Sequence, residues 1–316
     1  MLQIRTPHLD QPDPLGLPPY AEEIHGVHAG RVTLRAFANT GNWMLATEWQ
    51  PSMRRAWRYR GLVAGAVWRE LRAQSMGSLL GLAWLVLQPA AMVALYTLVF
   101  AKVMGARLPG TSTGGFDYSV YLCAGLLPWQ WWADGVQRLQ GVFVRHANLL
   151  KKAAFPRLTL VAVELGVSTV QFALVAGVFL LFWLTSGTPK GWAALAALPA
   201  LAVQLALMAG LGVLLGVLHV FFRDVGQALG VGLVFWFWLT PIVYPLQVLP
   251  AWAQGWVLLN PMTTLVQFYQ AALYDGRWPA ANEWWRLVAV ATLALGLLAL
   301  AWKLYRSRAA EMVDEL

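Results

Sequence analysis

The chain has 316 residues, of which 59% are apolar and only 12% are charged, about half of the ~25% charged share of soluble globular domains. Its net charge is +8, but the basic residues follow the ends of apolar segments instead of gathering on one face, which argues against nucleic-acid binding. The single cysteine, Cys123, excludes an intrachain disulfide and is expected to serve packing.

Residues 1–52 are polar and rich in proline, and we interpret them as a cytosolic extension. From residue 53 to 72, apolar side chains recur at helical spacing along one face and arginines occupy the opposite face. This pattern predicts an amphipathic interface helix over 53–74 that contacts membrane lipids in the headgroup region. An ordinary surface helix packed on protein is the alternative. The predicted interfacial side chains are Arg54, Arg58, Trp68 and Arg69.

Long stretches without charge follow, and a helix needs about 20 apolar residues to cross a bilayer. The longest, 225–274, has fifty residues without a formal charge. The fold class predicted is therefore an all-α integral membrane protein. We predict a transmembrane domain over 75–305 with six spans, placed near 79–101, 117–137, 159–184, 192–219, 227–244 and 285–304.

Lysine and arginine are distributed unevenly around these spans. With the N-terminus inside, 18 of the 23 basic residues lie on the cytosolic side and five lie outside. Because basic residues favour the cytosolic side of a membrane, both termini are predicted to be cytosolic, including a tail over 306–316.

The apolar segment between the fifth and sixth spans is broken by prolines, which deny it one continuous helix. Two short helices fit it, near 250–259 and 261–273, and each is too short to cross the bilayer. We therefore predict a re-entrant hairpin over 246–273 that forms an outer gate beside a water-filled path. Two tilted spans, giving eight helices, are the alternative. The predicted gate residues are Pro245, Pro250, Trp252, Asn260 and Pro261.

Aromatic residues are the most informative class, because 18 tryptophans are present and many are clustered. Four consecutive rings at 235–238 point around most of a helix, so some of them must face protein or a lumen. Rings that line a conduit could stack on sugars, whereas an interfacial aromatic belt is the alternative explanation. The side chains predicted to line a channel are Trp84, Gln88, Tyr96, Trp129, Trp132, Phe235, Trp236, Trp238 and Tyr244.

The sequence contains no motif for catalysis. None of the five lysines ends a P-loop and the five histidines form no metal-binding pattern, so neither a catalytic residue nor a metal or cofactor is expected in this chain. Glu164, inside the third span, is the best intramembrane candidate for a functional ionisable group. We favour a structural role for it, in which it pairs with Arg157 or reaches the headgroups.

Six short motifs occur in order, namely GLAWLVLQP at 81–89, YLCAGLLPW at 121–129, LKKAAFPR at 150–157, FFRDVGQ at 221–227, TPIVYP at 240–245 and LNPM at 259–262. With these motifs the sequence resembles, over residues 60–305, the membrane subunits of ABC transporters that export lipid-linked polysaccharides, including O-antigen, teichoic acid and capsule permeases. The resemblance implies six spans, an interface helix, two short outer helices, and a homodimer in the bacterial inner membrane with the channel between its protomers.

The resemblance also implies a separate ABC ATP-binding subunit, present in two copies, that binds ATP and Mg²⁺. It places the contacts with that subunit after the second span and at the cytosolic end of the fourth, at Arg145, Lys151, Lys152, Phe155, Pro156, Arg157, Arg223 and Asp224. The expected function is ATP-driven export of a lipid-linked polysaccharide. Two alternatives stay open, an exporter of a drug or small lipid, and an intramembrane glycosyl- or acyltransferase with Glu164 or His219 as its base.

Overall fold

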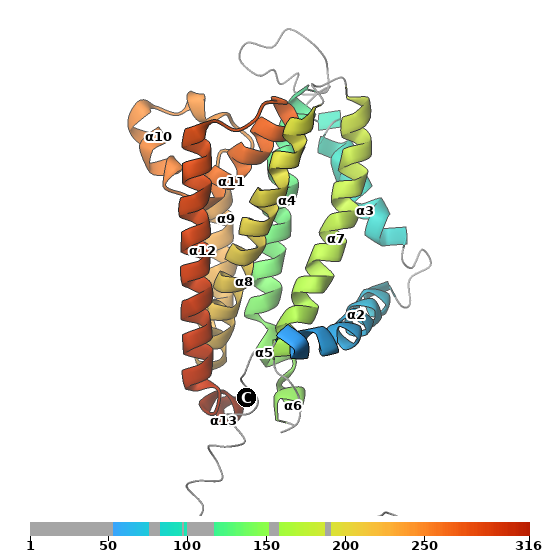
Figure 1. The fold of residues 1–316 in the computed structure, drawn as a ribbon, viewed down its shortest axis with the longest axis vertical. Coiled ribbons are helices and arrows are strands. Elements are labelled where there is room, and N and C mark those ends of the chain that lie inside the picture. Colours follow the sequence, from blue (N-terminus) through green and yellow to red (C-terminus); the bar gives the residue numbers. More distant parts are fainter. Residues whose placement is uncertain (1–52, 76–82, 97, 100–116, 152–157, 187–190) are drawn as a thin grey trace, which may run out of the picture. The chain divides into compact units, whose positions relative to one another are not determined.

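The computed structural model describes residues 53–75, 83–96, 98–99, 117–151, 158–186 and 191–316 (Figure 1). The predicted extension over 1–52 lies outside these residues. The regular elements of the described segments are all helical, without a strand among them, and Arg54–Leu316 form one compact unit. The helical fold class predicted from the sequence is therefore confirmed.

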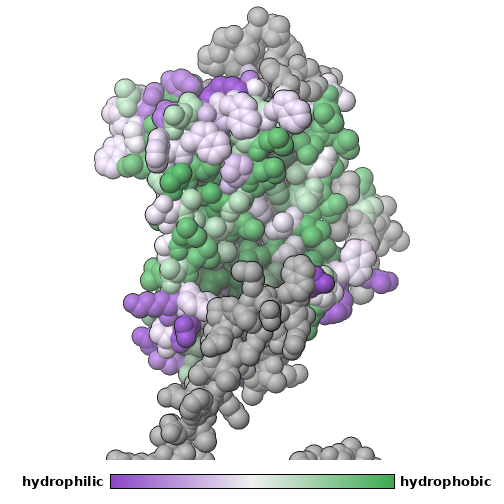
Figure 2. Space-filling view, viewed as in Figure 1, coloured by the Kyte–Doolittle hydropathy of each residue, from purple (hydrophilic) through white to green (hydrophobic). Residues whose placement is uncertain are grey.

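Within the described segments, three helices are long and apolar enough to cross a membrane: α7 (Leu158–Thr185), the run of η3 (Trp192–Ala196) and α8 (Ala197–Phe221), and α12 (Ala281–Arg308). They agree with the predicted spans 159–184, 192–219 and 285–304. On the face drawn in Figure 2, apolar side chains form a band and hydrophilic side chains gather at both ends of it, as a bilayer-embedded protein requires.

The other three predicted spans correspond to α3 (Trp84–Tyr96), α4 (Asp117–Gln140) and α9 (Asp224–Trp238). Helices α3 and α9 have 13 and 15 residues, so each is about 20 Å long, less than the ~30 Å of a hydrocarbon core. Helix α9 ends six residues before the predicted limit of 244, because Pro241 disfavours helical backbone at the residue before it. Six membrane crossings therefore stay a prediction. Three of the six corresponding segments form described helices with the length and hydropathy of a membrane span.

Close packing of α8 against α12 and α4 forms the centre of the bundle. A Cβ added at Gly210 of α8 would lie 2.9 Å from the backbone nitrogen of Leu298 in α12, and one added at Gly212 would lie 2.6 Å from Cβ of Leu139 in α4. Glycine at these positions lets the helices approach closely, as small residues do in membrane bundles. Cys123 lies buried in a second cluster between α4 and α7, so its predicted packing role is confirmed.

The segment between α9 and α12 contains the two predicted short helices, α10 (Ala251–Leu258) and α11 (Pro261–Tyr269), preceded by the 3₁₀ turn η4 (Leu246–Val248) and followed by the π-helical turn η5 (Gln270–Tyr274). Pro261 is the first residue of α11, where its missing N–H costs nothing. Residues 262–266 of α11 are buried, whereas α10 has no buried residue. Helix α11 therefore belongs to the bundle, and α10 lies on its surface.

At the opposite end of α12 from α10 lie three short helices, α5 (Val142–Arg145), α6 (Ala147–Leu150) and α13 (Glu311–Glu315) (Figure 1). Helix α2 (Met53–Ser75) packs on α7 through Val67 and Leu71, which are buried against Val167. A Cβ added at Gly166 of α7 would lie 2.7 Å from Val67. One face of α2 is thus packed on protein, which is the alternative raised from its sequence pattern.

Candidate functional site

Buried aromatic rings join α4 to α9 inside the protomer. Trp129 and Trp132 of α4 are 4% and 0% exposed. The ring of Trp132 lies edge-on to that of Trp236 in α9, with 4.8 Å between centroids, and Trp129 lies 5.9 Å from Phe237. The structure therefore places these two predicted channel residues under the protomer surface, where they position the aromatic residues of α9.

Other predicted channel residues do lie at the surface. Phe235 and Trp238 of α9 are 66% and 61% exposed, and Trp84 of α3 is 50% exposed. Tyr244 is partly buried and donates its hydroxyl to the Trp238 carbonyl at 2.7 Å. Gln88 and Tyr96 lie on α3, but their side chains are outside the described part of the structure.

Asn260 connects α9 to the two short helices through four hydrogen bonds. Its Oδ1 accepts from the Trp236 indole N–H at 2.8 Å and from the Met262 backbone N–H at 3.0 Å, so it also caps α11. Its Nδ2 donates to Thr240 Oγ1 at 2.9 Å and to the Leu239 carbonyl at 3.5 Å. A single amide therefore fixes the position of α11 relative to the end of α9.

A groove of about 530 Å³ lies beside this junction, between α9 and the α10–α11 connection. We call it the aromatic groove, and its walls are formed by Gly232, Phe235, Trp236, Leu239, Trp256, Val257, Asn260 and Pro261. Trp256 and Trp252 of α10 are 73% and 75% exposed. Of the predicted gate residues, Asn260 and Pro261 line the aromatic groove, Trp252 lies on the exposed surface of α10, Pro250 precedes that helix, and Pro245 precedes η4.

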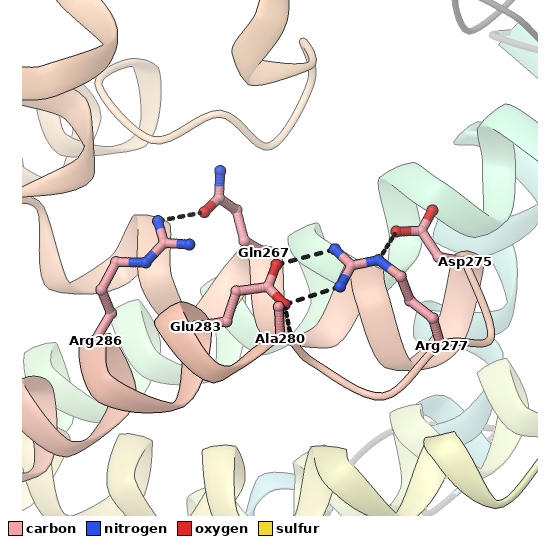
Figure 3. Close-up of polar contacts among 6 residues, drawn as sticks. All are labelled: Gln267, Asp275, Arg277, Ala280, Glu283 and Arg286. Carbon is pink, nitrogen blue, oxygen red and sulfur yellow. Dashed lines mark hydrogen bonds and ion pairs between the residues drawn. The ribbon is translucent and has the colours of Figure 1, made fainter.

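Charged side chains fix the connection from η5 to α12 (Figure 3). Arg277 donates to both carboxylate oxygens of Glu283, at 2.8 and 2.9 Å, and to Asp275 at 3.1 Å. Burial raises the pKa of the Asp275 carboxyl, which Arg277 opposes, and the hydrogen bond to Glu283 raises the pKa of Arg277. Arg286 donates to Gln267 of α11 at 3.1 Å, so these contacts tie α11 and the residues after η5 to the first turns of α12.

At the other end of the bundle, Glu164 of α7 is 7% exposed and faces three basic groups. Arg145 of α5 contacts its carboxylate at 2.7 Å, His146 lies at 3.7 Å, and Arg138 of α4 lies at 3.9 Å. The structural role predicted for Glu164 fits this arrangement, with Arg145 as its closest partner; the expected partner Arg157 is outside the described residues. A carboxylate held in this way is not placed as the free base that an intramembrane enzyme would need.

The remaining residues predicted to contact an ATP-binding subunit lie at the same end or outside the described structure. Lys151 is exposed after α6, while 152–157, with Lys152, Phe155 and Pro156, are not described. Arg223 and Asp224 are exposed at the start of α9. The Asp224 carboxylate is favourable there, because the N-terminus of a helix carries partial positive charge.

Trp68 of the interface helix is 57% exposed and Arg69 is exposed as well, so both point away from α7. Side chains at 53–59, which include Arg54 and Arg58, are outside the described part of the chain. The exposed tryptophan fits an interfacial position, and Val67 and Leu71, on the neighbouring face of the same helix, pack on α7.

Sequence reasoning missed a buried polar link through Gln204 of α8. Its Nε2 donates to the Pro128 carbonyl of α4 and its Oε1 accepts from the Tyr269 hydroxyl of α11, both at 2.6 Å. A glutamine inside an otherwise apolar span was the available indication, since buried polar groups require partners. Among the described residues, no cluster of His, Cys, Asp and Glu could hold a metal ion.

Comparison with known proteins relates this architecture to a transporter family. The family described as "ABC-2 type transporter" matches residues 62–274. The O-antigen export system permease protein RfbA of Myxococcus xanthus is 29% identical over 266 residues, covering 84% of this chain and 98% of that protein. An RfbA of Klebsiella pneumoniae is 25% identical, covering 66% and 78%, and the polysialic acid transport protein KpsM of Escherichia coli is 23% identical, covering 78% and 92%.

Proposed function

The chain belongs to the ABC-2 type transporter family, and from this premise we propose that it is the channel-forming permease subunit of an ATP-driven exporter of a lipid-linked polysaccharide. The similarity to an O-antigen export permease over 98% of that protein's length carries the proposal. The KpsM relative, named for polysialic acid transport, supports a polymer of sugars as cargo.

ATP and Mg²⁺ bind, in this proposal, to a separate ABC subunit present in two copies, because no lysine of this chain ends a P-loop. That subunit docks at the end of the bundle formed by α5, α6 and the start of α9. Glu164 supports the docking surface by holding Arg145 and Arg138 in place. Most basic residues flank this end, so it is the cytosolic side of the bacterial inner membrane, with both termini inside.

Two copies of the chain frame the lumen. The exposed rings of Phe235 and Trp238 offer sugar-stacking faces along α9, and the buried Trp129 and Trp132 hold that helix in place. Helices α10 and α11 form the outer gate, in which Asn260 fixes α11 to the end of α9 and the aromatic groove lies beside this junction. Each contact between a sugar ring and an aromatic side chain is weak, so a moving polymer can exchange one contact for the next as it passes along α9.

Complementation of a strain that lacks this chain tests the proposal. Surface polysaccharide should return with the intact chain and a functional ATP-binding partner, and it should not return when the P-loop lysine of the partner is replaced. Export of a small lipid or drug, with no effect on surface polysaccharide, would contradict the proposed cargo. ATP-independent turnover of a sugar donor by the purified chain would indicate an enzyme instead.

A further inference from the structure

A second, polar groove of about 560 Å³ lies between α4, α5 and α9, near the Glu164 ion pairs. We call it the polar pocket. Its walls are Asp134, Gln137, Arg138 and Gln140 of α4, Arg145 of α5, and Gly226 and Gly230 of α9. It is separate from the aromatic groove, with which it shares no lining residue.

The inner wall of the polar pocket contains polar atoms without a partner among the described residues. Gln140 is 8% exposed and its Nε2 makes no hydrogen bond there; Nδ1 of the partly buried His219, which does not itself line the pocket, also has no partner. Both groups lie beside Gly226, where an added Cβ would be 3.1 Å from the Gln140 Nε2 and 3.0 Å from the His219 Cε1. A buried donor without a partner destabilises the fold, so such groups call for a ligand or water.

The charges around the polar pocket are balanced. The guanidinium groups of Arg138 and Arg145 already face Glu164, at 3.9 and 2.7 Å, and Asp134 adds a further carboxyl group to the wall. An anion would therefore meet two acidic groups as well as two basic ones, and an acyl chain would leave the buried Gln140 amide without a partner. The hydroxyl groups of a sugar ring suit the wall better, because one can accept from the Gln140 amide while another donates to the Asp134 carboxylate.

We infer that the polar pocket binds a sugar ring of the exported glycan through its hydroxyl groups. This inference rests on the proposed function and specifies which part of the cargo the cytosolic end of the subunit recognises. Helix α9 contributes glycine where a side chain would occupy the ligand's space. A Cβ added at Gly230 meets no atom within 4 Å, so packing does not require glycine at this position.

That open space provides the test. Gly230→Leu would fill the polar pocket without a backbone clash, and Asp134→Asn and Gln140→Leu would remove the two proposed hydroxyl partners. Gly296→Leu on α12, where an added Cβ also meets nothing within 4 Å, is the matched control. The full-length chain is purified into nanodiscs, and two labelled probes are compared: the glycan cut from its lipid by mild acid, and polyprenyl diphosphate without sugar.

We expect Gly230→Leu to weaken glycan binding about tenfold or more, equivalent to ~1.4 kcal/mol, with smaller losses for Asp134→Asn and Gln140→Leu and none for Gly296→Leu. Binding of polyprenyl diphosphate should not change. The inference is overturned if the wild-type chain does not bind the glycan, if Gly230→Leu binds it as Gly296→Leu does, or if Gly230→Leu weakens diphosphate binding instead. Should Gly230→Leu fail to fold, Gly230→Ala and Asp134→Asn decide by the same criteria.

Complementation separates this inference from the proposed function. If the wild-type chain restores export but pocket variants bind the glycan normally, the polar pocket is not the sugar site and the exporter assignment stands. If the wild-type chain binds the glycan through the polar pocket but restores no export, the sugar site stands and the exporter assignment is wrong.

Discussion

Trp236 of α9 donates its indole N–H to Oδ1 of Asn260 at 2.8 Å, and the same oxygen accepts from the first turn of α11. The Asn260 side chain that caps α11 therefore also holds Trp236, whose ring packs on the tryptophans of α4. These tryptophans are Trp129 and Trp132, so the Asn260 hydrogen bond links α11 to this ring cluster.

Replacing Asn260 should loosen this junction. We expect Asn260→Ala to lower the free energy of unfolding by about 2 kcal/mol, because it removes a helix cap and a partly buried hydrogen bond. Asn260→Asp keeps both interactions of Oδ1 and should cost less. Unfolding can be followed by labelling Cys123 with a thiol-reactive dye, since the chain's one cysteine is buried. Equal stability of Asn260→Ala and the exposed control Gln247→Ala would contradict the junction.

Buried and exposed tryptophans should respond differently to truncation. Trp132→Ala should reduce stability by about 3–5 kcal/mol, as expected for a fully buried ring. Trp238→Ala should leave the unfolding free energy nearly unchanged and slow export, because its ring is 61% exposed and we propose that it faces the glycan. The two measurements are Cys123 labelling and the rate of polysaccharide export. Unchanged export in Trp238→Ala would remove this residue from the proposed lining.

Neutralising Glu164 should leave Arg145 and Arg138 without their common carboxylate. We expect Glu164→Gln to cost about 1–2 kcal/mol, less than a fully buried pair because Arg145 is half exposed. A double-mutant cycle with Arg145→Gln measures the pair, and the double variant should be more stable than the sum of the two losses predicts. Strictly additive losses would mean that the 2.7 Å contact contributes nothing.

Gly210 should tolerate no larger side chain, since its Cβ would reach the backbone of α12. Gly210→Ala is expected to destabilise the bundle by about 1–3 kcal/mol through overpacking. Gly296→Ala serves as the control, because an added Cβ there meets nothing within 4 Å and alanine favours the helix. If Gly210→Ala and Gly296→Ala gave the same Cys123 labelling, α8 and α12 would not be packed as closely as the structure places them at Gly210.

Local patterns allowed several elements to be predicted. Apolar length predicted α7, α8 and α12, and prolines predicted the two short helices that follow α9, since hydropathy and the missing N–H of proline act through the immediate chain. The position of α10 and α11 in the membrane stays a prediction. The predicted extension of the fifth span to 244 is wrong for the helix itself, which ends at Trp238 because Pro241 disfavours helical backbone at the residue before it.

The sequence alone therefore determined which segments avoid water, that the segment after α9 is not one continuous helix, and which residue types are available for a conduit. Only the tertiary structure decided which aromatic rings are buried, that Asn260 reaches Trp236, and that Arg145 is the closest partner of Glu164. These outcomes depend on contacts between helices distant in the chain. Residue spacing fixes the face a side chain occupies on its own helix, but not the neighbour that this face meets.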